Sequence, residues 1–553
     1  MVQSLQNYKK HSLNISANFN KSFNDHHFGA TVGYNQELSR WKNVGGTQTN
    51  LLSEDLNDFN LGTGVPLLSG GEESWALQGF FGRVNYDYKG RYLLEVNGRY
   101  DGTSKFPAGQ RYGFFPSFSA GWRIMEEPFL AAAKEYVNEA KVRVSYGSLG
   151  NAQEASAYGY IPLLGSGNAA YLLNGGRAQY LNLPAPISAD LTWERTSTLN
   201  FGADFEFAQN RLTASFDYFI RETLDMLIPG KTLPAVYGAN SPKTNAGDLR
   251  NTGWELSLAW RDQFTAAEKP FGYSIGLGLS DSKAEITRFD NPKNLLNNYY
   301  VGQVLGDIWG YQIDGLFQSN EEASAWDVNQ DRVDARRLSA PGDWSKLQAG
   351  DPRFVDLNGD KVINQGNNTL EDPGDQIIIG NNRARYTFGV NLGANWQGFD
   401  VSAFFQGIGR QHWWPGSNAD KFWGPYSRPY YSFVPEKFEE DVWTPENPDA
   451  YFPLLRGYVA LDGNSSLNVK SDRYLQDLAY VRLKNLTIGY TLPNTVMSKL
   501  KLSNARIYLS GENLWTATKL RSDYIDPEQA AQESNGRAYP YSRTFSFGLD
   551  FTF

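Results

Sequence analysis

The last nine residues of the chain, Phe545-Ser-Phe-Gly-Leu-Asp-Phe-Thr-Phe553, decide the fold. Apolar side chains alternate there with Ser546, Gly548, Asp550 and Thr552, so a strand built from this stretch has one apolar face and one small, polar face. Such an apolar face is buried or faces lipid, while the other face suits a water-filled or plugged lumen. The stretch therefore predicts the last strand of an outer-membrane β-barrel.

The same alternation recurs along the whole chain. Tyr386 to Trp396 alternates apolar with small polar residues, and the runs 199–207 and 273–280 repeat the pattern. Alternation alone also fits a soluble β-sandwich or propeller. Many runs here reach the roughly 9–11 residues that cross a bilayer when tilted, whereas strands of soluble proteins usually have about 5–6. The sequence therefore favours an all-β, transmembrane antiparallel β-barrel.

Composition agrees with a barrel and excludes other classes. The chain has 553 residues, 54 glycines, 14% aromatic residues, no cysteine and a net charge of −9. A nucleic-acid-binding protein would need a basic surface, so we expect no nucleic-acid partner. The mean hydropathy of −0.50 and the lack of an apolar run of ~18 residues exclude helical membrane spans. Barrel strands keep hydropathy low because half of their side chains face water.

The orientation of the strands can be counted backwards from the C-terminus, taking short connections as periplasmic and long ones as extracellular. Tight turns at Lys89-Gly90 and Gln397-Gly398, and a short helix over 128–138, then fall on the periplasmic side. We expect about fifteen strands, near residues 11–20, 27–38, 75–88, 91–102, 112–125, 140–149, 195–208, 211–227, 252–262, 270–287, 385–396, 399–410, 474–492, 504–518 and 542–553. The first of them runs downward. Because single-chain bacterial barrels have an even number of strands, this count predicts an odd number of strands before Met1.

The beginning of the sequence supports the same expectation. Met1 to Lys10 contains no apolar core that would serve as a signal peptide. A barrel protein needs such a signal to leave the cytoplasm. We therefore expect that residues 1–553 are the C-terminal part of a longer protein.

Ordered motifs along the chain resemble one known family. The stretch Gly82-Arg-Val-Asn-Tyr-Asp-Tyr-Lys-Gly-Arg-Tyr-Leu-Leu94 and the closing run Tyr480-Val-Arg-Leu-Lys-Asn-Leu-Thr-Ile-Gly-Tyr-Thr-Leu-Pro493 are similar to the barrel signature of the SusC/RagA family of TonB-dependent transporters. Further matching motifs lie at 99–106, 115–122, 141–147, 150–151, 193–194, 245–248, 251–255, 356–360, 443–448 and 511–514. The resemblance covers essentially the whole chain.

This resemblance implies a fold and a function. Such transporters carry a signal peptide, a small regulatory-like domain, a TonB box, a plug domain and the first barrel strands, none of which we find in this sequence. Large plugged transporters have about 22 strands, of which about 15 are expected here. The implied function is TonB-driven import of an oligosaccharide or peptide across the cell outer membrane. The implied partners are a SusD-like surface lipoprotein acting as a lid, TonB-ExbB-ExbD through the missing upstream segment, and outer-membrane lipid.

Specificity is expected in the extracellular loops, because loops on a rigid barrel vary without loss of the fold. Long loops are predicted at 39–74, 151–192, 288–384 and 411–473. The last is rich in aromatic residues that stack on ligands or anchor interfaces. The candidate substrate- or partner-binding residues are Trp413, Trp414, Phe422, Trp423, Tyr426, Tyr430 and Tyr431. The alternative is a self-packed loop with a small core of its own.

A second candidate site lies in the 288–384 loop. Asp356, Asn358 and Asp360 have the spacing of oxygen ligands at positions 1, 3 and 5 of a calcium loop, with the Val362 carbonyl at position 7 and Asn364 at position 9. Position 6 lacks the usual glycine and position 12 lacks a carboxylate. The alternative to a Ca²⁺ site is an Asx turn that shapes the loop.

Three classes of function remain. The first is the import just described. The second is a passive pore or structural surface barrel, if the chain is complete as given. The third is a soluble glycan-binding or glycan-cleaving β-protein. We find no nucleophile elbow, P-loop or zinc-protease motif, and we expect no enzyme activity.

Overall fold

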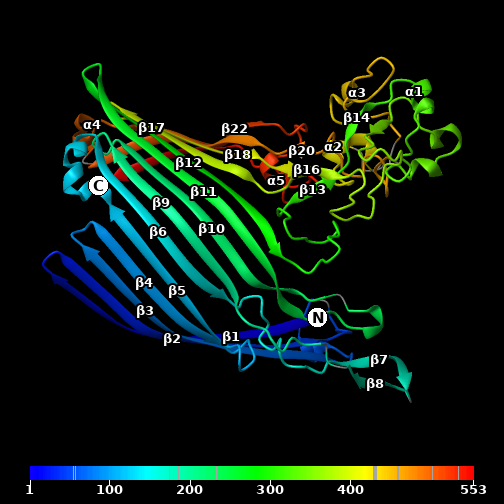
Figure 1. The fold of residues 1–553 in the computed structure, drawn as a ribbon, viewed down its shortest axis with the longest axis horizontal. Coiled ribbons are helices and arrows are strands. Elements are labelled where there is room, and N and C mark those ends of the chain that lie inside the picture. The colour runs from blue at the N-terminus through cyan, green and yellow to red at the C-terminus, as the bar shows by residue number, and fades with distance from the viewer. Residues whose placement is uncertain are drawn as a thin grey trace.

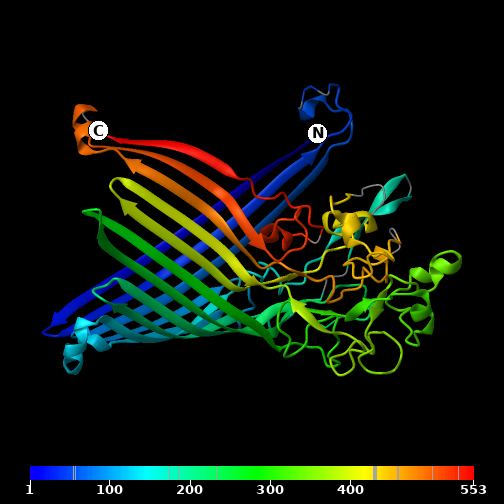
Figure 2. The ribbon, with the colours of Figure 1, turned by 90° about the horizontal axis from the view of Figure 1, so that it is seen from above.

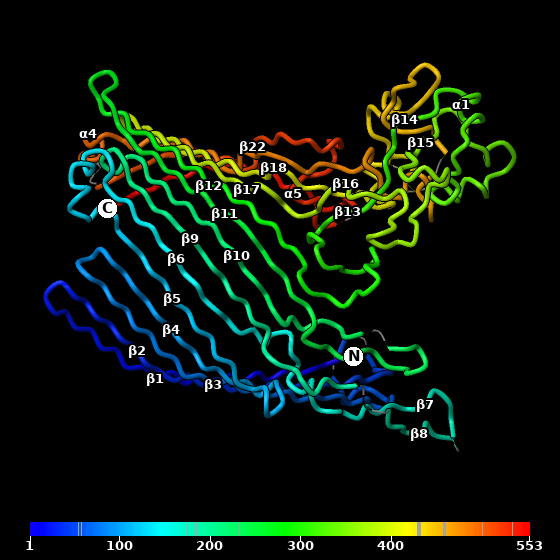
Figure 3. Tube along the Cα trace, in the orientation of Figure 1, coloured from blue at the N-terminus to red at the C-terminus, as the bar shows by residue number. Residues whose placement is uncertain are grey.

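The computed structural model of the chain describes residues 1–553 except 54, 57, 174, 183, 185, 232, 428–432, 457–459, 501 and 534. One antiparallel sheet of 15 strands dominates it and curls around an open interior (Figure 1; the tube in Figure 3 shows the same path). Its strands are β1 (Val2–Phe23), β2 (His26–Thr47), β3 (Leu67–Tyr88), β4 (Tyr92–Thr103), β5 (Tyr112–Arg123), β6 (Val137–Asn151), β9 (Glu194–Phe207), β10 (Leu212–Pro229), β11 (Lys243–Ala266), β12 (Lys269–Arg288), β17 (Arg385–Trp396), β18 (Phe399–Arg410), β21 (Tyr480–Thr491), β22 (Asn504–Thr518) and β23 (Thr544–Thr552).

Each of the fifteen predicted strands is confirmed, and the strands pair in chain order. The first three are much longer than expected, at 22 residues each. β1 pairs with β2 without interruption from Val2 opposite Thr47 to Phe23 opposite His26. The predicted long loop at 39–74 is therefore wrong. Paired strand occupies 39–47 and 67–74, and the connection itself spans only 48–66.

Short connections gather at one end of the sheet, at the left of Figure 1. The predicted turns there are confirmed, since Lys89 and Gly90 adopt left-handed φ values of 58° and 64°, and Gln397 and Gly398 values of 48° and 86°. Two consecutive left-handed residues match the twist of a two-residue hairpin. The predicted helix at 128–138 is a shorter 3₁₀ helix, η3 (Pro128–Glu135), with proline in its first turn.

The two faces of the sheet differ as the alternation requires. On the outer face, Leu392 lies between its register partners Ile275 and Ala403 and is 40% exposed. Its neighbour Asn391 points to the inner face. Apolar residues thus cover the outside of the sheet, where lipid is the solvent, and polar residues line the inside.

The sheet is not closed on itself. Within the described residues, β1 pairs only with β2, and β23 pairs only with β22. Figure 2 shows these two edge strands, at the blue and red ends of the chain. A closed β-barrel has no free edges, whereas this sheet has two in the described part of the chain.

The remaining elements lie mainly in long loops at the opposite end, at the right of Figure 1. Short strand pairs are β7 (Ser166–Leu173) with β8 (Gly176–Leu181), β13 (Asp307–Gly310) with β16 (Ile377–Asn381), β14 (Ile313–Leu316) with β15 (Pro352–Phe354), and β19 (His412–Trp413) with β20 (Gln476–Asp477). Helices are α1 (Asn320–Ala325), α2 (Asp420–Trp423), α3 (Phe438–Asp441), α4 (Asn494–Leu500) and α5 (Pro527–Ala530), with 3₁₀ turns η1 (Phe59–Leu61), η2 (Ile124–Glu126), η4 (Ala235–Tyr237), η5 (Arg337–Ser339), η6 (Gly342–Ser345) and η7 (Gly424–Tyr426). Among the described residues, none of these helices has the length and apolar character needed to cross a bilayer.

Three loops pack into one unit, which we call the loop cap: residues 289–384, 411–479 and 519–543. Its core contains buried residues from all three, including Phe354, Trp423, Tyr474 and Ile525. Backbone hydrogen bonds tie the first two loops together, for example from the Tyr311 amide to the Lys470 carbonyl at 2.9 Å. The loop cap therefore covers one side of the barrel mouth as a folded body.

Candidate functional site

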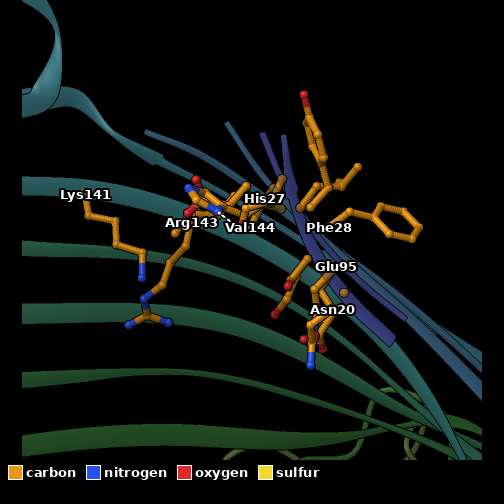
Figure 4. A pocket seen from close by; sticks show the side chains of 18 of the residues that line it. Asn20, His27, Phe28, Glu95, Lys141, Arg143 and Val144 are labelled. Carbon is orange, nitrogen blue, oxygen red and sulfur yellow. Dashed lines mark hydrogen bonds between the residues drawn. The ribbon is translucent and has the colours of Figure 1, made fainter. Parts of the chain in front are cut away.

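The inner wall of the sheet is polar and charged. A hollow of about 610 Å³ lies along the inner face of β1 to β6. Figure 4 shows Asn20, Glu95, Lys141 and Arg143 extending from the same face of the sheet toward it. Charged groups of both signs keep such a surface hydrated or paired with another polar surface. This wall suits a lumen that holds water or a polar plug.

Arg143 is the centre of a charge network on this wall. Its guanidinium donates to Asp204 at 3.0 Å and to Asp217 at 2.6 Å. Asn200 and Ser215 donate to the same two carboxylates. Paired guanidinium–carboxylate contacts of this geometry are strong and directional. They fix the inner faces of β6, β9 and β10 to one another.

The predicted aromatic site residues lie inside the loop cap. Trp413, Phe422, Trp423 and Tyr426 are at most 6% exposed, and Trp414 packs against them. The Trp423 indole donates to the Gly416 carbonyl at 3.1 Å, and the Tyr426 hydroxyl donates to the Pro453 carbonyl. The remaining two, Tyr430 and Tyr431, lie outside the described residues.

The burial of Trp413, Phe422, Trp423 and Tyr426 in the core of the loop cap fits the alternative of a self-packed loop. Binding of a ligand or a partner by the seven candidate residues stays a prediction. Burial raises the pKa of the Tyr426 hydroxyl well above its ordinary value and raises the pKa of Tyr451 to about 12. The high aromatic content of residues 411–473 is therefore consistent with a folded loop, because large rings supply most of the area that a small core can bury.

The candidate calcium loop is a chain of Asx-type hydrogen bonds. The Asp356 carboxylate accepts the backbone amides of Gly359 at 2.8 Å and Lys361 at 2.9 Å, and the Asp360 carboxylate accepts the amide of Val362 at 2.8 Å. The Asn358 and Asn364 side chains accept the amides of Asp360 and Gly366. No group of three or more histidine, cysteine, aspartate or glutamate side chains that could hold a metal ion occurs among the residues that the structure describes. This geometry fits the Asx-turn alternative, and the calcium site stays a prediction.

Asp375 organises the same loop, and the sequence analysis missed it. Its side chain is fully buried, and its carboxylate accepts the amides of Leu357 and Asn364, each at 2.8 Å. Burial raises the pKa of this carboxyl, although the backbone donors oppose the change. The only sequence signal for it is a carboxylate just before the apolar run Ile377-Ile-Ile379.

Two buried ion pairs hold another part of the loop cap. Arg337 donates to Asp334 at 2.9 Å, and Arg456 donates to Asp351 at 2.7 and 2.6 Å. All four side chains are less than 10% exposed. Burial and the nearby Asp351 charge raise the pKa of Asp334 to about 6. Arg456 also links the 411–479 loop to the 289–384 loop, so these charges lock the loops together.

A wide antiparallel sheet with an apolar outside, a charged inside and folded loops at one end is typical of an outer-membrane β-barrel. The sequence model of the family described as TonB dependent receptor-like, beta-barrel, matches residues 2–514. The chain belongs to this family, whose members reside in the outer membrane. The SusC/RagA type of barrel, the fold class and the location in the outer membrane expected from the motifs are thereby confirmed.

Individual relatives belong to the same class of protein, the TonB-dependent receptors. TonB-dependent receptor P26 from Formosa agariphila is 31% identical over 91% of this chain and 49% of its own length. TonB-dependent receptor SusC from Bacteroides thetaiotaomicron is 26% identical over 86% of this chain and 44% of its own length. The chain thus spans about half the length of the curated relatives it matches.

Among solved structures, the RagAB peptide transporter has a similar fold. The TM-score is 0.74 at 22% identity, and the match covers 100% of this chain and 56% of that chain. The open-open state of the RagAB peptide importer gives a TM-score of 0.75. At this identity the similarity establishes the fold alone.

Proposed function

We propose that this chain forms the barrel wall and the extracellular loop cap of a TonB-driven importer of oligosaccharides or peptides. The observation that carries this proposal is the pairing of a charged lumen wall, centred on Arg143, with a large folded cap on the same barrel. A barrel with a purely structural role needs neither a charged lumen wall nor a large folded cap. The family and its named TonB-dependent receptors support a transport role over an enzymatic one.

We further infer that residues 1–553 are the C-terminal part of a larger barrel. An odd number of antiparallel strands leaves the two edge strands parallel to each other, so β1 and β23 cannot complete the antiparallel pattern by joining. An odd number of additional strands closes it. Seven upstream strands together with a plug domain bring the total to about 22, the number in large plugged transporters.

The partners follow from the same proposal. A SusD-like surface lipoprotein acts as a lid over the barrel mouth, and TonB-ExbB-ExbD supplies energy through the upstream segment. Since Trp413 and Trp423 are buried and Trp414 packs against the same core, the lid contacts the outside of the cap instead of these rings. The lid partner is supported by the resemblance to SusC and RagA.

The test is uptake by intact cells of the source bacterium. We expect uptake of labelled oligomers to be lost on deletion of this gene and, equally, on deletion of the TonB gene. Purification of the tagged protein in mild detergent is expected to bring down one surface lipoprotein encoded beside it. Uptake that persists without TonB would favour a passive pore, and the absence of in-frame plug sequence upstream would overturn the domain proposal.

A further inference from the structure

A cavity of about 880 Å³ opens in the loop cap, apart from the lumen wall and bordered on one side by Tyr311 and Val333 of the buried core. Four separate segments build it, from residues 296–311, 331–338, 364–376 and 464–470. Its volume lies within the range of roughly 300–1,000 Å³ that is usual for small-molecule sites.

Amide side chains are the most numerous polar residues of its lining, which also contains seven apolar or aromatic residues. Seven asparagine or glutamine residues line the cavity, against four charged residues. Five of these amides make no side-chain hydrogen bond within the described part of the chain, and these are Asn297, Gln365, Asn368, Gln376 and Asn464. Each amide offers both donors and an acceptor. The cavity thus presents a set of unused, uncharged hydrogen-bonding groups.

The lining also contains a tryptophan ring and equal numbers of acidic and basic residues. Trp309 lines the cavity, and its indole donates to the Tyr300 hydroxyl at 3.3 Å, which fixes the ring. The charged residues are Asp307, Asp331, Arg332 and Lys470, two of each sign. The formal charge of the lining is therefore zero. Nothing in this balance favours an anionic or a cationic ligand.

The cavity is held in shape before any ligand arrives. The Asx-bonded loop containing Asn364 forms one wall and is anchored by the buried Asp375. The Ala335 amide donates to the Asn464 carbonyl at 2.7 Å, which joins two walls from different loops. A preformed site loses less entropy on binding than one that must be ordered by its ligand.

We propose that this cavity binds a neutral oligosaccharide, which rests on and deepens the importer function proposed above. Sugar hydroxyls both donate and accept, so they match amide side chains one for one, and a sugar ring presents C–H groups to an indole face. A charged ligand would leave part of its charge unmatched in a lining of zero net charge. A peptide backbone also bonds to amides, so peptides of the same length are the comparison ligands in the test.

The experiment measures binding to the full-length protein purified in detergent. The probes are fluorescently labelled short glucans, mannans and xylans, with uronate-containing oligosaccharides and uncharged peptides of the same length for comparison. The test variant is Gln365→Ala/Gln376→Ala/Asn464→Ala, which removes side chains that hold no other described residue in place. The control is Gln532→Ala, an exposed amide of the loop cap outside the cavity. Heat-modifiability on gels verifies that each variant is folded.

We expect at least one neutral oligosaccharide to bind saturably, with about a tenfold or greater loss of affinity in the triple variant and none in the control. Binding of only peptides or only uronates would overturn the proposal while leaving an importer function in place. Equal affinity in the triple variant and the wild type would also overturn it. Glycan binding without TonB-dependent uptake would support this binding site and contradict the importer function. Failure of the site proposal is therefore distinguishable from failure of the importer proposal.

Discussion

Leu392 tests the environment of the outer face. It lies on β17, between Ile275 and Ala403, with its side chain toward lipid. We expect Leu392→Arg to lower the free energy of unfolding by about 2–4 kcal/mol, because the charge enters the apolar middle of the bilayer. Urea unfolding of the protein in lipid vesicles measures this change.

The matched control for this substitution is its neighbour. Asn391 faces the lumen, so Asn391→Arg adds a charge to a surface that already carries charges, and we expect a much smaller loss. Equal losses at the two positions would show that the faces of β17 are exchanged or that the outside of the sheet is not in lipid.

Asp334 gives the loop cap a pH dependence. Its pKa of about 6 in the folded cap exceeds the ordinary value of an aspartate, because burial and Asp351 disfavour its charged form. A raised pKa means that the folded state binds the proton more tightly, so the stability that Asp334 contributes is fully present below about pH 4 and is lost as the pH rises through 6. The contribution is about 2–3 kcal/mol. Tryptophan fluorescence during thermal unfolding at about pH 5 and pH 7.5 measures it.

The variant Asp334→Asn removes this titration, and we expect its stability to change less between the two pH values. Asp343→Asn is the control, because that carboxylate is 87% exposed and pairs only with exposed Lys346. A wild-type cap that is more stable at the higher pH would contradict the assignment.

The aromatic loop behaves as an element with its own core. Trp423 is fully buried between Phe422, Phe452 and Tyr474. We expect Trp423→Ala to destabilise the loop cap by about 3–5 kcal/mol through the cavity that it leaves. Because the β-sheet does not depend on this core, the barrel should remain heat-modifiable while proteases cut within 411–479.

The comparison variant is Trp344→Ala, since Trp344 also lies in the loop cap but is 49% exposed. We expect it to leave the protease pattern unchanged. Loss of the barrel together with the cap in Trp423→Ala would mean that the two do not fold as separate elements.

The elements of this protein differ in how well the sequence predicts them. Strands such as β17 are predictable because apolar and polar residues alternate within each strand. The polarity of each side chain therefore indicates which face of the sheet it occupies. The fold of the loop cap is not predictable in this way, because its contacts join positions that are distant in the sequence, such as Tyr311 with Lys470 and Ala335 with Asn464. The aromatic residues of 411–473 indicate that this loop differs from the others, but composition alone does not distinguish a buried core from a contact surface.

The amides of the cavity illustrate the same limit for a site. Asn297, Gln376 and Asn464 come from three distant segments of two loops and carry no motif spacing. Each is an ordinary polar loop residue when taken alone. Only the folded cap brings them to one cavity, so no periodicity or short motif would have found this site.

At the scale of the whole molecule, the open sheet predicts which strands are neighbours in the membrane. β1 and β23 both run toward the end with short turns, so they cannot pair as antiparallel neighbours. We expect Ser16→Cys with Ser546→Cys to form no disulfide under mild oxidation of the full-length protein in membranes. Additional strands that lie between β1 and β23 keep these two positions farther apart than the roughly 7 Å that a disulfide tolerates between Cα atoms.

The positive control uses two serines that are direct register partners, Ser119 on β5 and Ser145 on β6. The chain contains no cysteine of its own, so any disulfide within residues 1–553 comes from the introduced pair. We expect Ser119→Cys with Ser145→Cys to crosslink efficiently, because opposite residues on antiparallel strands lie about 4.5–5.5 Å apart. A crosslink of similar yield between positions 16 and 546 would mean that these fifteen strands close on themselves. In that case no further strands line the barrel, its lumen is too narrow for a plug of the usual size, and the lumen wall around Arg143 must be filled by side chains from its own strands.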